Sequence, residues 1–263
     1  MENLGTFVGI PDWRSAVLAL LFALPWLLLL GWAWFRARRE RALVALGALA
    51  LAAVLFAPSI AWVQVPIQRA LGALLIGRLG QSAVARYWFL AGLPGLLAAS
   101  LVQEVAKLLV AVAALRIVPG ERGARPGLAL GGAAGAGYGG FEAFWTFNLI
   151  LAQGWSWATV QLGGPLALAG FYERLYAVPF HAASVALSAY GYATGRPWRF
   201  LGLAVALHTL VNYGVLLLGG GVLSPVAMEA WGTLFAGITI ALALWLRRRQ
   251  APEPVSPPAE QAG

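Results

Sequence analysis

Long apolar runs alternate with short arginine-bearing segments along most of the chain. Seven such runs lie at 14–35, 42–64, 88–117, 128–152, 166–192, 200–218 and 225–246. An α-helix rises 1.5 Å per residue, so about 20 apolar residues cross the hydrocarbon core of a bilayer. The pattern therefore predicts an all-α fold, a polytopic transmembrane helix bundle with about seven spans.

Two stretches of this pattern are irregular. Residues 65–87 place Arg69, Arg78 and Arg86 among Leu, Ile and Ala. This composition favours an interfacial helix that lies flat on the membrane, and an eighth span is the alternative. The 88–117 run contains Gly92-Leu-Pro-Gly95, where we expect a kink or a break in the helix.

The arginines sort the connections between runs into two sets. Four lie in 36–41, three in 116–125, two in 196–199 and three in 247–249, whereas only Arg14 and the three of 65–87 lie on the other side. Because basic residues mark cytoplasmic loops, we expect the N-terminus outside and the C-terminus inside. The arginine bias, with a single lysine in the chain, is typical of a GC-rich genome and favours a bacterial cytoplasmic (inner) membrane.

Composition limits where any chemistry can lie. Of 263 residues, 60% are hydrophobic and 11% are charged, against about 25% charged in soluble domains. No soluble catalytic domain fits beside the spans, so a site must lie inside the bundle. The chain has no cysteine, which excludes disulfides and thiolate catalysis. The net charge of +8 follows the loops and indicates topology, not nucleic-acid binding, so membrane lipids are the expected surroundings.

The ends of the chain complete this outline. Residues 1–13 carry no basic n-region, and no small-residue cleavage site follows the first apolar run, so we expect no cleaved signal peptide. Residues 1–249 form one predicted transmembrane domain, and its polar site lies within 100–215. The Pro-rich segment 250–263 is expected to be a disordered cytoplasmic tail.

Charged and polar residues interrupt the third run at bilayer depth. Gln103, Glu104 and Lys107 lie in its middle, and Lys107 is one turn beyond Glu104. An ionised side chain at the bilayer centre costs about 2.5–3.5 kcal/mol on insertion scales unless it faces partners or water. An ion pair that only joins neighbouring helices would explain these residues. The other runs then decide between this structural role and a site.

Four runs carry such residues, and both histidines of the chain are among them. They are Glu104 and Lys107 in the third run, Glu142 in the fourth, Glu173, Arg174 and His181 in the fifth, and His208 and Asn212 in the sixth. Counted from the predicted cytoplasmic ends, the two glutamates at 104 and 142 and the two histidines lie roughly 12–21 Å deep. Two carboxylates and two imidazoles at one depth favour a functional site.

The fourth run also repeats glycine at four-residue spacing, at Gly131, Gly135 and Gly139. Small residues at this spacing let a neighbouring helix backbone approach closely. The repeat predicts tight helix packing around this run. It does not explain Glu142 in the same run.

Two chemistries fit the residue types. A carboxylate beside a histidine can deprotonate a trapped water and direct it at a carbonyl, with a second histidine or Asn212 stabilising the oxyanion. His181, His208 and Glu142 would also suit a catalytic zinc. The chain contains no His-Glu-x-x-His and no Gly-x-Ser-x-Gly, so neither of those hydrolase signatures supports an assignment.

Four motifs in order resemble the PrsW/YhfC families of intramembrane proteases, in the clan that includes the CPBP (Abi) and CAAX-prenyl proteases. The motifs are Gln103-Glu-Val-Ala-Lys107, Gly135-Ala-Gly-Tyr-Gly-Gly-Phe-Glu142, Glu173-Arg174 with His181, and His208-Thr-Leu-Val-Asn212. The resemblance covers about 100–215. It implies hydrolysis of a peptide bond of a membrane-associated protein or peptide.

The same resemblance assigns roles to residues. Glu104, Glu142, His181 and His208 match positions that hold or activate the water, and Asn212 matches the oxyanion helper. Gln103, Lys107, Glu173 and Arg174 would support them. Members of these families are described both as metalloproteases and as metal-free glutamic proteases, so the cofactor is either none or zinc.

One position departs from the family pattern. The first motif usually begins with two adjacent glutamates, and here Gln103 takes the first place. Glutamine cannot act as a general base. Either Glu104 or Glu142 then serves as the base, or the chain is an inactive pseudoprotease that binds a membrane partner. A proton-coupled transporter that uses the same acids and histidines is a further alternative.

Overall fold

A computed structural model describes residues 7, 12–35, 38–118 and 123–250 of the chain. The described part is helical throughout and contains no strand, so the all-α prediction is confirmed. Its helices are α2 (Trp13–Phe35), α3 (Arg39–Pro58), the π-helical turn η1 (Ser59–Gln64), α4 (Val65–Leu79), α5 (Gln81–Arg86), α6 (Trp88–Ala91), α7 (Leu93–Ile117), α8 (Ala124–Ala152), α9 (Trp157–Gly163), the 3-10 turn η2 (Pro165–Leu168), α10 (Ala169–Ala193), α11 (Pro197–Gly219) and α12 (Pro225–Arg249).

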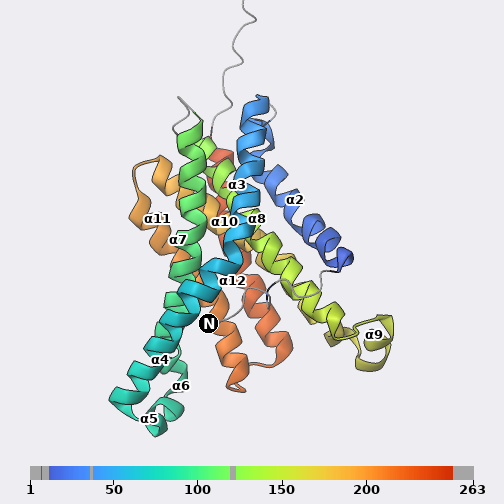
Figure 1. The fold of residues 1–263 in the computed structure, drawn as a ribbon, viewed down its shortest axis with the longest axis vertical. Coiled ribbons are helices and arrows are strands. Elements are labelled where there is room, and N and C mark those ends of the chain that lie inside the picture. The colour runs from blue at the N-terminus through green and yellow to red at the C-terminus, as the bar shows by residue number, and fades with distance from the viewer. Residues whose placement is uncertain (1–6, 8–11, 36–37, 119–122, 251–263) are drawn as a thin grey trace, which may run out of the picture.

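Five helical stretches of the described chain are long and apolar enough to cross a membrane. They are Trp13–Trp32, Arg39–Leu79, Trp88–Ile117, Pro197–Gly219 and Pro225–Arg249. The predicted spans at 128–152 and 166–192 are the long helices α8 and α10, with 29 and 25 residues. These two helices lie in the middle of the bundle (Figure 1), so they present small and polar side chains to other helices.

The glycines of α8 allow this central position. A methyl group on Gly135 would fall on the carbonyl oxygen of His181 in α10, and one on Gly137 would fall on the carbonyl oxygen of Leu49 in α3. On another side of α8, Gly132 lies against Leu30 of α2. Glycine is thus required where the backbones of α10 and α3 touch α8, and the α10 contact, at Gly135, lies on the four-residue repeat that predicts tight packing.

Helical structure continues past the predicted end of the second span. The span was expected to end near residue 64, whereas α3, η1 and α4 follow one another without interruption as one helical stretch, Arg39–Leu79. Pro66 has no N–H to donate to the preceding turn, and a wide π-helical turn lies immediately before it. The α4 helix then leaves the bundle with none of its residues buried (Figure 1).

Two other connections can be compared with their predictions. At the predicted Gly92-Leu-Pro-Gly95 the interruption is slight: α6 ends at Ala91 and α7 begins at Leu93, but Gly92 between them keeps helical dihedral angles and Trp88–Ile117 is one helical stretch. The connection between the predicted spans at 128–152 and 166–192 contains the short helix α9, whose first turn is closed by a capping box between Ser156 and Thr159. The predictions for residues 1–6, 8–11 and 251–263, and for Arg36 and Arg122, fall outside the described residues.

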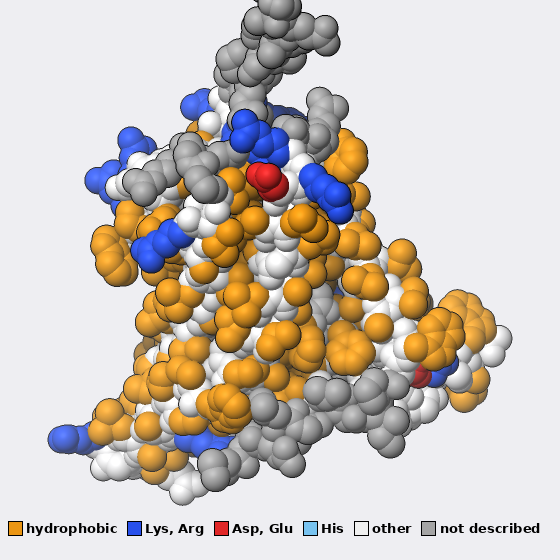
Figure 2. Space-filling model, turned by 45° about the horizontal axis from the view of Figure 1, so that its top comes forward, with side chains coloured by type: hydrophobic (Ala, Val, Ile, Leu, Met, Phe, Trp, Pro, Cys, Tyr) orange, Lys and Arg blue, Asp and Glu red, His pale blue; other side chains and the backbone are white. Residues whose placement is uncertain are grey.

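The arginine-bearing ends of the helices lie together. The helices α2, α7, α10 and α12 end where α3, α8 and α11 begin (Figure 1). Figure 2 shows Lys and Arg side chains gathered at this end, above a broad belt of hydrophobic side chains. We call it the arginine end. This alternation of helix directions is what a bundle with cytoplasmic arginines requires.

The contact between α8 and α10 can be tested with a single methyl group. In Gly135→Ala, the added methyl meets the His181 carbonyl, so α10 must shift. We expect the free energy of unfolding to fall by about 1–3 kcal/mol, the usual cost of overpacking, measured by denaturant unfolding in detergent. Gly47→Ala in α3 is the matched control, because nothing lies within 4 Å of its added methyl. Equal unfolding midpoints would contradict the close contact.

Candidate functional site

Four helices bring ionisable side chains into one connected group, which we call the polar cluster. Its members are Glu104 and Lys107 of α7, Glu142 of α8, Glu173, Arg174 and His181 of α10, and His208 of α11. The α7 pair is completely inaccessible, and the two histidines expose 3% of their surface. The residues that sequence analysis placed at one depth therefore lie together in space.

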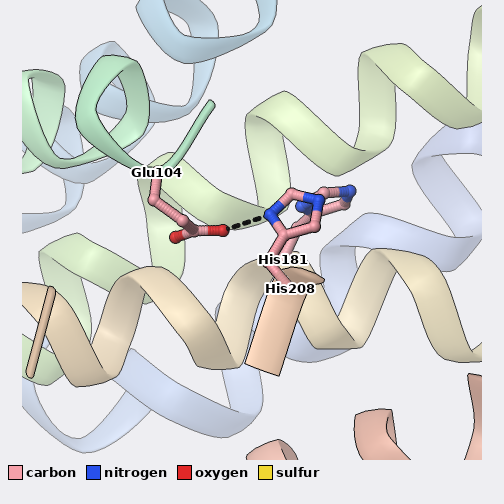
Figure 3. Close-up of side chains that lie close together, drawn as sticks. All are labelled: Glu104, His181 and His208. Carbon is pink, nitrogen blue, oxygen red and sulfur yellow. Dashed lines mark hydrogen bonds and ion pairs between the residues drawn. The ribbon is translucent and has the colours of Figure 1, made fainter. Parts of the chain in front are cut away.

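Glu104 is the most heavily bonded carboxylate of the cluster. Its Oε1 accepts hydrogen bonds from Lys107 Nζ at 2.6 Å, from His208 Nδ1 at 2.7 Å and from Ser184 Oγ at 3.2 Å. Its Oε2 is buried and has no hydrogen-bond partner among the described residues. Figure 3 shows the carboxylate of Glu104 directed at the two imidazoles. One oxygen thus holds the surrounding groups, and the other keeps its lone pairs available.

The partners of His208 fix its tautomer. A carboxylate oxygen can only accept, so Nδ1 of His208 must carry the proton that is donated to Glu104. The other ring nitrogen, Nε2, is then unprotonated in the neutral imidazole. His208 therefore presents a basic lone pair on the side of the ring away from the carboxylate. A carboxylate that orients a neutral imidazole in this way is a common arrangement of general bases.

His181 has the opposite tautomer. Its Nδ1 lies 2.9 Å from Lys107 Nζ, and an ammonium can only donate, so Nδ1 accepts. Its Nε2 lies 2.6 Å from Glu142 Oε2 and must donate to that carboxylate. Both ring nitrogens of His181 are therefore engaged. His181 is built to hold Lys107 in place, and it has no lone pair left to take a proton.

Charges of opposite sign alternate through the remainder of the cluster. Arg174 Nη1 lies 3.3 Å from Glu142 Oε1, and Arg174 Nη2 lies 2.5 Å from Glu173 Oε1. A buried charge costs several kcal/mol unless a counter-charge and hydrogen bonds compensate it. The alternation supplies this compensation for Lys107 and for Glu142. The supporting positions that sequence analysis assigned to Lys107, Glu173 and Arg174 are thus part of one connected network.

Aromatic and hydroxyl groups complete the surroundings, and sequence analysis gave them no role. Lys107 Nζ lies 5.1 Å from the centre of the Tyr138 ring, within range of a cation–π contact. The Tyr138 hydroxyl is 2.8 Å from Ser59 Oγ, and the Phe180 ring packs against both imidazoles. Tyr138 is four residues before Glu142, and Ser184 is three residues after His181. A search for polar residues three or four positions from the ionisable residues, on the same helix face, would have identified both.

Gln103 lies apart from the polar cluster. Its Nε2 donates to Gln64 Oε1 at 2.9 Å, Gln64 Nε2 donates to Gln68 Oε1 at 3.3 Å, and Gln68 Nε2 donates to the carbonyl of Gly95 at 3.1 Å. We call this series the glutamine ladder. It joins α7 to η1 and α4. The position where the resembling families carry their first glutamate therefore has a helix-joining role in this chain.

Asn212 also lies outside the cluster. It is on the same helix as His208, one turn further along, and lines an open cavity of about 720 Å³. Asn212 thus lies on the same face of α11 as His208, as their four-residue spacing predicts. The role of oxyanion helper that the family resemblance implies for Asn212 stays a prediction.

Three residues of the cluster could supply ligands to a metal ion. Ligand atoms of Glu104, His181 and His208 lie within 4.8 Å of one another, whereas the zinc set expected from sequence contained Glu142 in place of Glu104. The Lys107 ammonium, however, is bonded to both Glu104 Oε1 and His181 Nδ1. Zn²⁺ beside this ammonium would bring like charges together in a medium of low dielectric constant. The residues do not fit zinc while Lys107 keeps its place and its charge.

Comparisons of the chain with protein-family models, curated proteins and solved structures gave no match. Nothing in them bears on the resemblance to the PrsW/YhfC families, which stays a prediction. Functional assignment therefore rests on the side chains of the polar cluster.

The competition between Lys107 and a metal leads to a measurable difference. We expect the purified native protein to retain no stoichiometric zinc after dialysis, measured by inductively coupled plasma mass spectrometry. Lys107→Ala removes the ammonium from the Glu104, His181 and His208 triad, so its zinc content should rise toward one ion per chain. The double variant Lys107→Ala/His208→Ala should lose this zinc again. One zinc per native chain, lost in His208→Ala, would contradict the assignment.

Proposed function

We propose that this protein is an intramembrane peptidase that works without a metal and uses the Glu104–His208 pair to activate water. The observation that carries the proposal is the pairing of a completely buried carboxylate with Nδ1 of the His208 imidazole at 2.7 Å. This pairing leaves His208 Nε2 as a base inside the bundle. A peptide bond is the proposed substrate because the four motifs of 100–215 resemble those of intramembrane proteases.

The proposed reaction adds water across the scissile bond. His208 Nε2 takes a proton from the water as the water oxygen attacks the carbonyl carbon, and Glu104 stabilises the imidazolium that forms. The Lys107 ammonium stabilises the negative charge that develops on the carbonyl oxygen. His208 then returns the proton to the leaving nitrogen, so one water is consumed and a carboxylic acid and an amine are released.

The other half of the polar cluster positions Lys107 in this proposal. His181 accepts one hydrogen bond of the ammonium, and Glu142 fixes the His181 tautomer from the far side. Arg174 pairs with Glu142 and so keeps that carboxylate available to His181. Glu142 and His181 thus act through Lys107, which differs from the direct roles that the family resemblance implies for them.

The fold supplies the setting for the proposed reaction. We place seven spans in the bacterial cytoplasmic membrane, with the N-terminus outside and the arginine end in the cytoplasm. The proposed partners are lipids and a membrane-associated protein or peptide, with no role for nucleic acid. An inactive pseudoprotease is the less favoured alternative, because the residues proposed to activate water are Glu104 and His208, and Gln103 has no part in that step.

Removing the proposed base should abolish cleavage. His208→Asn keeps an N–H that can donate to Glu104 and removes the imidazole base, and Glu104→Gln removes the charge that supports the imidazolium. We expect each variant to cleave about 10²–10⁴-fold more slowly, the usual contribution of a general base. The measurement is the cleavage rate of a fluorogenic single-span peptide in proteoliposomes.

Folding and alternative functions need their own controls in this experiment. Thr209→Val is the matched control, because Thr209 follows His208 in α11 and its hydroxyl donates to the Val205 carbonyl of its own helix; it should cleave at the native rate. A folded His208→Asn variant with native activity would refute the mechanism. Proton uptake by liposomes that Glu104→Gln abolishes, with no cleavage by the native chain, would favour a transporter.

Restoring the family's first glutamate gives a separate test of the pseudoprotease alternative. In Gln103→Glu, the side chain loses the N–H that it donates to Gln64 and gains no path to the cluster. We expect no increase in cleavage rate and a lower unfolding midpoint. Gln103→Ala should keep most of the native activity. A gain of activity in Gln103→Glu would show that the native chain is an inactive relative.

A further inference from the structure

An open cavity lies between α11 and the start of α7, with α5 and α6 also contributing to its lining, at the end of the bundle opposite the arginine end. Its volume is about 720 Å³, within the range of ligand pockets. We call it the α7–α11 groove. Its lining is apolar except for one amide, and it includes Trp88, Leu96, Asn212, Val215, Gly219 and Gly220.

Two rows of residues lead from the α7–α11 groove to the proposed base. Along α7, Leu96 and Glu104 are two turns apart, with Ser100 midway between them; along α11, Asn212 is one turn from His208. Residues four apart share a helix face. The rows meet where Glu104 bonds His208, roughly 12 Å along α7 from the groove.

Polar atoms without partners mark this route. Ser100 is completely buried, and its Oγ has no hydrogen-bond partner among the described residues. The same holds for Glu104 Oε2, one turn deeper. A buried polar atom that lacks a partner costs about 1–3 kcal/mol. Both residues are completely buried and lie outside the groove lining, so a peptide backbone would reach them only by moving α7 and α11 apart, and it would then supply the missing partners.

We propose that the α7–α11 groove binds an extended apolar segment of the substrate peptide, whose chain continues past Ser100 to Glu104 and His208. The proposal rests on the proposed peptidase function and identifies its substrate-binding site. Asn212 then acts in substrate binding: its side chain pairs with a backbone N–H and C=O of the extended segment.

The chemistry of the groove favours a peptide over a lipid tail. Inside a bilayer, the N–H and C=O groups of an extended backbone must find partners, because no water is present. Asn212 offers both a donor and an acceptor, and an acyl chain can use neither. Gly219 leaves open space for a backbone, since nothing lies within 4 Å of a methyl group built on it.

The absence of native cysteine allows a direct test by disulfide crosslinking. Leu96→Cys points into the groove, whereas Leu97→Cys is on the same helix turn, 47% exposed and outside the groove lining. The probe is a synthetic Leu/Ala peptide of about 20 residues, long enough to span the bilayer, with a single central cysteine, in phosphatidylcholine vesicles. We expect several-fold more crosslinking at position 96, although position 97 is the more exposed.

Two further variants test the groove itself. Gly219→Leu fills it and should reduce the crosslink at position 96 several-fold, whereas Gly202→Leu, on the same helix and equally open but outside the lining, should not. Asn212→Leu should weaken peptide binding about tenfold, the equivalent of one lost hydrogen bond of about 1.4 kcal/mol.

The outcomes separate this proposal from the proposed function. Crosslinking that favours position 96 without any cleavage supports the groove and refutes the peptidase. Cleavage with equal crosslinking at 96 and 97 refutes the groove and leaves the peptidase standing. Labelling of the groove by a photoactivatable phospholipid that the peptide cannot displace also overturns the proposal.

Discussion

The hydrogen bond between Lys107 Nζ and Glu104 Oε1 is the constraint on which the centre of this molecule depends. Both groups are completely buried, and breaking such a pair by removing one partner typically costs about 3–5 kcal/mol. The helices around it must therefore bring further donors and acceptors to the same point. The hydroxyl of Ser184, the two imidazoles and the face of Tyr138 meet that requirement from three other helices, α8, α10 and α11.

The order of the hydrogen bonds follows from this pair. An ammonium only donates and a carboxylate only accepts, so each histidine that touches one of them has its proton assigned by its neighbour. His181, bonded to Lys107, must accept with Nδ1, and His208, bonded to Glu104, must donate with Nδ1. Two chemically identical side chains thereby acquire different capacities. Only His208 retains a basic nitrogen.

Much of the fold and part of the site could be predicted from the sequence. The helices follow from apolar length, and the residues of the polar cluster follow from their cost at bilayer depth. The positions of Gln103 and Asn212 could not be predicted, because periodicity gives the face of a helix only to within a few tens of degrees. The extension of α3 into α4 was also missed, since Arg69 and Arg78 indicate where polar surface begins and carry no information on whether the helix continues.

The glutamine ladder has a consequence for how position 103 can change over evolutionary time. Each inner amide both donates and accepts, so the ladder has a direction that runs from Gln103 through Gln64 and Gln68 to the carbonyl of Gly95. A carboxylate at 103 would face the carbonyl oxygen of Gln64, and relieving that repulsion by turning the Gln64 amide would leave its N–H pointing away from Gln68. An acid at this site would thus require an adjustment of the amides on a second helix, and the substitution of Gln103 alone would leave the ladder mismatched.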